Sequence, residues 1–238
     1  MLAAGVLLLA GCTSGPEAPR SAPRSEPVPE PVPETASETA SETTAGTVPR
    51  AQPTRTTEPV DAAYHSDGTP RRAVLSIPAI AVRDLVVVPY RGRTDDAPGT
   101  EIQDGGRAAS PFGPRGGVGP GGIGNFQVTA HRTSSTRAFE LLPDLRPGAL
   151  VRVEAGGVRY VYRIVDTRQT SFRSPASLRE QRAAVPGQPG VEPSRAMITL
   201  STCATQEDHA AGNWWADRFG NPEHRIDKVG VLVASRPA

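Results

Sequence analysis

The chain has 238 residues, of which 37% are hydrophobic and 21% are charged, and its formal net charge at pH 7 is +1. Its basic residues are scattered, with neither a lysine and arginine run nor an aromatic and basic face, so nothing in its charge points to nucleic acid. The strand-rich part of the chain, about 168 residues, is long enough to enclose one hydrophobic core.

The first segment, residues 1–15, is predicted to be an export signal. Its apolar run is shorter than the about 20 residues that span a bilayer, and it matches the hydrophobic part of a signal. Leu9-Ala10-Gly11-Cys12 resembles a bacterial lipoprotein processing box, which makes Cys12 a candidate lipid-attachment residue. No basic residues precede the apolar run, so a cleaved signal, or a longer uncleaved one whose start lies upstream, is the alternative.

Residues 16–70 are predicted to be a disordered linker rich in proline, glutamate, threonine and serine. They contain Glu26-Pro27-Val28-Pro29-Glu30 and the repeat Glu34-Thr35-Ala36-Ser37-Glu38-Thr39-Ala40-Ser41. Almost no residue in this segment can contribute to a core. Because proline keeps such chains extended, the linker can hold a globular module away from a membrane and inside a wall layer.

Residues 71–238 are predicted to form one all-β domain, either a barrel or a sandwich, because short β-rich runs alternate there with glycine and proline. Two short helices are expected, over 136–142 and 175–185, and each is ended by a proline. The predicted strands cover 73–78, 84–89, 125–131, 149–155, 158–167, 196–203 and 228–234.

The segment from Asp104 to Gly124 carries nine glycines. It lacks the Gly-x-x-x-x-Gly-Lys-Ser/Thr order, and no helix clearly follows it, so a phosphate-binding loop is not expected. We predict instead a flexible surface loop beside a site.

Cys203 stands at the end of the predicted strand 196–203 and is the only cysteine outside the first dozen residues. A strand end that passes into a loop is a common place for a nucleophile. If Cys12 is lipidated or cleaved away, Cys203 has no partner for an intramolecular disulfide, and a lone thiol in an oxidising exterior is notable. The alternative is a buried cysteine that packs as a small hydrophobic side chain.

A cysteine nucleophile needs a group that favours its thiolate, a proton donor for the leaving amine, and a cation or donor pair for the oxyanion. His131 ends the predicted strand 125–131, and two strand ends can meet in space, so His131 is the candidate proton donor. Among the other histidines, His65 lies in the linker, and His209 and His224 lie in the polar stretch after the cysteine.

Three further features follow Cys203. Glu207-Asp208-His209 offers one imidazole and no second set of ligands, so a solvated turn is expected there and no metal site. Trp214, next to Trp215, either covers the core or borders a substrate groove. Arg225 opens the last apolar run, although most arginines are surface charges.

These residues resemble the motifs of the sortase family. Thr199-Leu200-Ser201-Thr202-Cys203 resembles the family's threonine-leucine-x-threonine-cysteine signature, and Thr129-Ala130-His131-Arg132-Thr133 resembles its strand-end histidine motif. The order histidine, cysteine, arginine is also the family's, with Arg225 lying 22 residues after the cysteine. The resemblance covers residues 73–235, and its other matches are Leu75-Ser76-Ile77-Pro78, Ala138-Phe139-Glu140-Leu141-Leu142 and Leu145-Arg146-Pro147-Gly148.

The resemblance implies an all-β fold, a single sortase-like closed β-barrel of about eight strands with short helices, preceded by the disordered linker. It implies that Cys203 attacks a Thr-Gly peptide bond of a sorting motif as a thiolate and forms a thioacyl enzyme. His131 would give a proton to the departing amine and later accept one from the incoming nucleophile. Arg225 would hold the carbonyl oxygen or the substrate backbone, because arginine remains cationic and presents several donors in a fixed fork.

The implied partners are exported proteins with a C-terminal sorting signal and an amine of a cell-wall precursor or of another protein, with water as a slow competitor. Ser201, Thr202 and Trp214 are expected to bind substrate, and neither a cofactor nor a metal is expected. The expected location is the outer face of the cytoplasmic membrane of a Gram-positive bacterium, through the N-terminal lipid or signal, or outside the cell. Because Lys228 is the only lysine, the composition also resembles that of actinobacteria.

The chain departs from the family's pattern in three places. Ala130 stands where the family usually has glycine before the histidine. The segment 204–223 is longer than in many members, so Arg218 is the alternative to Arg225. A lipoprotein box is unusual beside the more typical uncleaved anchor. The nearest subgroup resembles the actinobacterial housekeeping sortases, class E, with class F as the other candidate.

Two other functions are considered. An L,D-transpeptidase of peptidoglycan also uses an extracytoplasmic cysteine, but it has a His-Gly-Cys type of signature that Ser201-Thr202-Cys203 lacks. The second is a non-catalytic cell-envelope lipoprotein that binds wall peptides or a protein partner on a sortase-like barrel.

Overall fold

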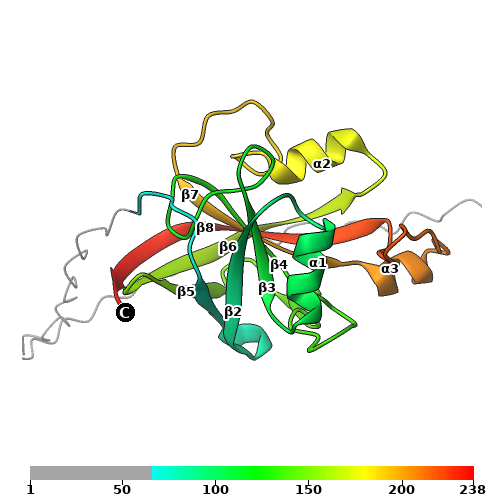
Figure 1. Ribbon diagram of the computed structural model, residues 1–238, viewed down its shortest axis with the longest axis horizontal. Helices are drawn as coiled ribbons and strands as arrows, with labels where there is room; N and C mark the ends of the chain where they lie inside the picture. The colour runs from blue at the N-terminus through cyan, green and yellow to red at the C-terminus, as the bar shows by residue number, and fades with distance from the viewer. Residues whose placement is uncertain (1–65) are drawn as a thin grey trace, which may run out of the picture. The chain divides into compact units, whose positions relative to one another are not determined.

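The computed structural model describes residues 66–238, so the predicted export signal, Cys12, His65 and nearly all of the predicted linker lie outside the described residues (Figure 1). The first described residues already bond to the folded part. Ser66 Oγ donates to the carbonyl of Pro120 at 2.6 Å, and the carbonyl of Gly68 accepts from the backbone N–H of Gly119 at 2.7 Å.

Eight strands close into one barrel in the order β1-β2-β3-β4-β7-β8-β6-β5, which confirms the expected barrel and excludes the sandwich. Most neighbours are antiparallel, but β2 pairs parallel to β3 and β4 pairs parallel to β7. Figure 1 shows the two long strands, β6 and β8, running side by side across the molecule. The strands are β1 (Ala73–Ile77), β2 (Val82–Arg91), β3 (Ala108–Phe112), β4 (Gly124–Thr129), β5 (Leu150–Ala155), β6 (Val158–Ser171), β7 (Ala196–Cys203) and β8 (His224–Pro237).

The barrel interior is an apolar core to which strands contribute every second side chain, as a pleated strand requires. Phe126 and Val128 of β4 and Ile198 and Leu200 of β7 are at most 1% exposed and belong to this core. The alternate residues of β4, and those of β7 and β8 toward the end that carries Cys203, point the other way and are mostly polar, although they too are largely buried. We call this set the polar outer face; it consists of Asn125, Gln127, Thr129, Thr199, Ser201, Cys203, Arg225 and Asp227.

Three α-helices and two 3-10 helices connect the strands. The N-terminus of α1 is capped by Asp96, which accepts from the N–H of Gly99 at 3.1 Å, and α2 begins in the same way at Ser174. In the described part of the chain, none of the helices is both long and apolar enough to cross a membrane. The helices are α1 (Ala97–Asp104), α2 (Pro175–Arg182), α3 (Thr205–Ala210), η1 (Pro78–Ile80) and η2 (Leu142–Asp144).

The predicted helix over 136–142 is wrong. Turns occupy most of that segment, and only η2 is helical at its end. Ser135 and Arg137 each have a φ of 53°, a left-handed backbone that cannot continue a right-handed helix. The helix predicted over 175–185 is confirmed as α2, although it ends earlier, at Arg182.

The glycine-rich segment is not the surface loop that we predicted over 104–124. It contains β3, and residues 119–122 are buried. A Cβ placed on Gly117 would lie 2.1 Å from the carbonyl oxygen of Asn125, and one on Gly119 would lie equally close to that of Thr69. The glycines therefore allow close packing of one backbone against another.

Candidate active site

Cys203 and His131 reach the same end of the barrel because their strands are parallel neighbours. In the ladder between β4 and β7, Thr129 pairs with Ser201, so His131 and Cys203 each follow two residues beyond that pair. On its other side β7 is antiparallel to β8, and there Cys203 pairs directly with Arg225. Residues that are far apart in sequence are thus brought together by strand register alone.

A cavity of about 280 Å³ lies at this end of the barrel, lined in part by His131 and Cys203. Asp104, at the end of α1, forms another part of its wall. Phe219 and Pro222, from the connection between α3 and β8, complete it on the side of β8. The cavity can therefore admit a peptide-sized group to both the imidazole and the thiol.

Asp104 holds the imidazole of His131 in place. His131 Nε2 lies 2.8 Å from Asp104 Oδ1, and the side chain of His131 is only 12% exposed. Ser135 Oγ in turn donates to the backbone carbonyl of Asp104 at 2.9 Å. Among the described residues, Nδ1 of His131 has no hydrogen-bond partner, so it is the nitrogen left for proton transfer. Asp104 was not predicted as a site residue, because it lies at the end of a helix, α1, that was not predicted either.

Cys203 is a partly buried free thiol. Burial raises the pKa of this thiol, because a thiolate loses hydration there, while the positive charge of Arg225 opposes that rise. The carboxylates of Asp95 and Asp217 also raise the pKa of Cys203, and the guanidinium of Arg132 lowers it. The thiol form is therefore favoured in the state described.

Arg225 is the largest fully buried side chain and is 1% exposed. Its Nη1 donates to the carbonyls of Pro222 at 2.9 Å and His224 at 3.1 Å, and its guanidinium carbon lies 4.2 Å from the centre of the Phe172 ring. Asp95 Oδ2 lies 3.3 Å from Arg225 Nε. Burial alone would lower the pKa of Arg225, but the neighbouring Asp95 and Cys203 outweigh it and leave that pKa raised.

Arg132 ties the ends of β4 and β7 to α3. Its guanidinium forms a bidentate ion pair with the carboxylate of Glu207, and its Nη1 lies 3.4 Å from the carbonyl oxygen of Cys203. The arginine is 6% exposed. This pair was not singled out from the sequence, since nothing there shows that α3 folds back onto the strand ends.

The predicted substrate-binding residues lie in different surroundings. Ser201 and Thr202 are each 2% exposed, with Thr202 Oγ1 donating to the carbonyl of Ala130 at 2.8 Å and Ser201 Oγ accepting from Gln181 Nε2 at 3.3 Å. Trp214 is 71% exposed, which excludes the alternative that it covers the core. Its substrate role stays a prediction, as do those of Ser201 and Thr202.

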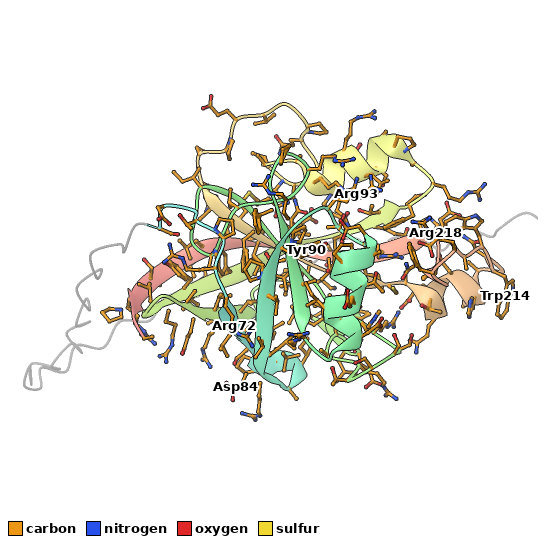
Figure 2. All side chains as sticks on the ribbon, viewed as in Figure 1. Arg72, Asp84, Tyr90, Arg93, Trp214 and Arg218 are labelled. Carbon is orange, nitrogen blue, oxygen red and sulfur yellow. The ribbon has the colours of Figure 1, made fainter. Side chains whose placement is uncertain are left out.

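Figure 2 shows Trp214 and Arg218 in the part of the molecule that carries α3. The ring of Trp214 stacks on that of His209, with centroids 4.0 Å apart. Arg218, the alternative to Arg225, is exposed and lies over the ring of Phe219, which lines the cavity. Register places only Arg225 beside Cys203.

The possible metal ligands in α3, the consecutive residues Glu207, Asp208 and His209, contact three different partners. Glu207 pairs with Arg132, Asp208 Oδ1 lies 2.6 Å from His224 Nδ1, and His209 stacks on Trp214. Over residues 66–238, no group of three or more histidine, cysteine, aspartate or glutamate side chains is placed to hold a metal ion.

Comparisons with known proteins show the family and the fold of the chain. The Sortase domain family model matches residues 75–218, more than half of the chain. No curated protein matches it. Among solved structures, it is similar to the SrtA sortase from Actinomyces oris, with 17% identity, a TM-score of 0.54, and coverage of 75% of this chain and 89% of that one. It is also similar to sortase E from Streptomyces avermitilis, with 23% identity, a TM-score of 0.51, and coverage of 73% and 93%.

Proposed function

The chain belongs to the sortase family, and we propose that it is a cysteine transpeptidase that cuts a Thr-Gly bond in the sorting motif of exported proteins, with Cys203, His131 and Arg225 as its catalytic residues. The observation that carries this assignment is the strand register, which sets Cys203 beside Arg225 and puts His131 and Cys203 each two residues beyond the pair of Thr129 and Ser201. Sortases act on exported proteins that carry sorting signals and on amine nucleophiles, outside the cytoplasm and in association with the membrane.

The first half of the reaction forms a thioester. The sulfur of Cys203 gives up its proton to His131 and attacks the carbonyl carbon of the threonine, so the carbonyl oxygen gains negative charge. When this intermediate collapses, the carbon–nitrogen bond breaks and the glycine amine leaves with the proton from His131. The acyl group then remains on Cys203 as a thioester.

His131 can carry a proton both ways because Asp104 occupies its Nε2. The carboxylate of Asp104 favours one ring orientation and stabilises the imidazolium that forms in transit, as an orienting acid does for other catalytic histidines. In the second half of the reaction His131 accepts a proton from the incoming amine, which attacks the thioester and releases Cys203. Water attacks the same thioester slowly, which gives hydrolysis.

Arg225 is the cation for the developing oxyanion. A guanidinium remains charged at any working pH, and in a buried site such a donor stabilises negative charge more than it does in water. Its Nε and Nη2 have no hydrogen-bond partner among the described residues, so both remain to be satisfied by a substrate oxygen.

The finer assignment follows the sequence resemblance. The sorting motif is of the Leu-Pro/Ala-x-Thr-Gly type, the subgroup is class E-like or class F-like, and the acceptor is an amine of a cell-wall precursor or of a pilin-like protein. Attachment through a lipid on Cys12 would place the domain 71–238 on the outer face of the membrane of a Gram-positive bacterium, with residues 16–70 as a spacer.

The decisive experiment is mass spectrometry of the full chain after incubation with Leu-Pro/Ala-x-Thr-Gly peptides. We expect a thioacyl adduct on Cys203, and a Cys203→Ala variant should form none and release no peptide fragment. Cys12→Ala, which removes the other cysteine, is the matched control and should keep both adduct and cleavage. Cleavage by Cys203→Ala would refute the assignment.

The second candidate function is a non-catalytic lipoprotein that binds wall peptides or a protein partner on the same barrel. Two observations favour it: the raised pKa of Cys203, and Ala130 in place of the family's usual glycine. A titration of thiol alkylation against pH separates the two functions, because an unactivated thiol reacts only in proportion to its ordinary thiolate fraction.

A further inference from the structure

The polar outer face, which carries Cys203 and Arg225, is covered in this structure. Gln181 of α2 lies against it and is 3% exposed. Its Nε2 donates to Asp227 Oδ1 at 3.0 Å and lies 3.3 Å from Ser201 Oγ. Asn125 Nδ2 donates to the backbone carbonyl of Gln181 at 3.1 Å. A peptide that approaches Cys203 along this face would therefore meet α2 where its own groups need to bind.

A second cover is the short connection between β2 and α1, residues 92–96, which we call the strap. Thr94 is 2% exposed and holds the strap to α2, since its Oγ1 donates to Gln181 Oε1 at 3.0 Å and accepts from Arg182 Nε at 3.0 Å. Tyr90, in β2, and Arg93, in the strap, are labelled in Figure 2. Tyr90 fastens the strap's near end, because its hydroxyl donates to the carbonyl of Arg93 at 2.5 Å.

The strap places one carboxylate on the buried arginine. Asp95 Oδ2 lies 3.3 Å from Arg225 Nε, and the two side chains are 9% and 1% exposed. The contact is an ion pair without a hydrogen bond: within the described residues, Asp95 Oδ2, Arg225 Nε and Arg225 Nη2 all lack a partner. Buried polar atoms without a hydrogen bond cost free energy, and so they mark a place where another group can bind.

The backbone at Asp95 has a conformation that aspartate adopts more readily than most residues. Its φ is 58°, in the left-handed region that side chains other than glycine, asparagine and aspartate rarely adopt. Its neighbour Asp96 stabilises the start of the helix instead, because it caps α1 and also accepts from the N–H of Arg93 at 3.0 Å. Asp95 is therefore not needed to form the helix, and within residues 66–238 its side chain forms an ion pair with Arg225 alone.

On the premise of the proposed function, we infer that Asp95 is a tethered stand-in for the substrate: its carboxylate holds Arg225 in the closed state, and the strap must withdraw before a peptide carbonyl can reach that guanidinium. Asp95 is thus a positioning residue that acts through Arg225. Closing keeps the guanidinium from water and in place, and opening exposes the nitrogens Nε and Nη2 for the oxyanion.

The closed state also suppresses the nucleophile. The negative charge of Asp95 works against the thiolate of Cys203 and partly cancels the support from Arg225. The other charged groups that act on the thiol are Arg132 after β4 and Asp217 after α3, and His131 lines the same cavity. None of these belongs to the strap, so their effect is the same in a variant that alters Asp95 alone.

The test is Asp95→Asn in the full chain, with the rate of iodoacetamide alkylation of Cys203 measured from pH 6 to 10, conditions that need no sorting peptide. Asparagine has the same shape and tolerates the left-handed backbone, so the strap is preserved. The alkylation profile should move to lower pH, with a rate at neutral pH about threefold higher. Asp84→Asn is the matched control, because Asp84 also has a left-handed φ, of 50°, but is exposed and is not among the groups that act on the thiol, so its profile should coincide with that of the wild type.

Peptide cleavage supplies the second measurement. Asp95→Asn should raise kcat/KM for a Leu-Pro/Ala-x-Thr-Gly peptide. Thr94→Val, which removes the two side-chain bonds from the strap to α2 but keeps the carboxylate, should raise it as well. An Asp95→Asn alkylation profile identical to the wild type overturns the inference, and so does a slower one, since Asp95 would then support Arg225. If the wild type cleaves no peptide, the proposed function fails, while the alkylation result still decides the role of Asp95.

Discussion

The barrel interior and the polar outer face are built from alternate residues of the same strands, yet they obey different rules. Phe126 and Leu200 face inward among apolar neighbours, and their burial stabilises the fold without any demand on direction. Ser201 and Asp227 face outward and are also buried, but each needs a hydrogen-bond partner, which Gln181 supplies. The interior therefore specifies the fold, and the outer face specifies where chemistry can occur.

The exceptions are as informative as the rule. Among the described residues, nearly every buried polar group on the outer face has a hydrogen-bond partner. The exceptions are Gln127 Oε1 and two nitrogens of Arg225, next to Cys203. An interior with a comparable defect would only lose stability. On the outer face, the same defect is what a reaction intermediate with a negative oxygen can satisfy.

The largest effect on stability is expected from a substitution in the barrel interior. Phe126→Ala should lower the free energy of unfolding by about 3–5 kcal/mol, because the cavity left by the ring cannot close. Urea denaturation followed by circular dichroism measures it. Val165→Ala, at a side chain that is 47% exposed, is the control and should change stability by no more than about 0.5 kcal/mol. Equal losses for both variants would contradict the division between interior and surface.

The next largest effect is a loss of activity, expected from a substitution on the polar outer face. Arg225→Gln should lower kcat/KM for peptide cleavage by about 10²–10³-fold, the usual loss when one oxyanion donor is removed. Arg218→Gln is the control, since Arg218 is exposed and does not pair with Cys203, and we expect it to keep nearly full activity. The reverse result would give the catalytic role to Arg218.

The smallest effect is expected in how the stability of the polar outer face depends on pH. Burial raises the pKa of Asp227 above its ordinary 3.8, although hydrogen bonds from Ser201, Thr170 and Gln181 oppose the rise. Because the folded state holds this proton more tightly than the unfolded state, its contribution to stability is complete below pH 3.8 and is lost as the pH rises through the raised pKa. Asp227→Asn should therefore gain stability relative to the wild type between about pH 3 and pH 7, by roughly 1.4 kcal/mol per unit of raised pKa.

A substitution with the opposite sign provides the control for that titration. The pKa of Asp67 is lowered, chiefly by a hydrogen bond from the backbone N–H of Thr69. Its contribution is present above pH 3.8 and is lost as the pH falls. Asp67→Asn should thus lose stability relative to the wild type as the pH rises over the same range. Unfolding curves at several pH values compare the two variants, and parallel trends would rule out the assignment of Asp227.

Local pattern was enough to predict the strands that form the site. The run 196–203, rich in threonine and apolar residues, is β7 with the same bounds, and the resemblance of its last five residues to a family signature singled out Cys203. The closed barrel could also be expected, because the number of short strands agreed with the family's fold. These features depend on residues close together in sequence, which is why they are readable there.

The features that were missed depend on tertiary contacts. Ala108–Phe112 contains alanine, serine and proline, which are poor strand formers, and it becomes β3 only because β2 pairs alongside it. Asp104 reaches His131 from the end of α1, and Asp95 reaches Arg225 from the strap. No spacing in the sequence relates these acids to their partners, since the path between them runs through folded loops.

The parallel pairing of β4 with β7 has a consequence for how such a protein can change. The two reactive side chains are fixed by the length of two short ladders, and a one-residue insertion in either would turn its group to the wrong side of the sheet. The connection between β6 and β7, residues 172–195, includes α2 and belongs to neither ladder. Evolution or an engineer can therefore exchange this connection to select new cargo while the reactive pair stays unaltered.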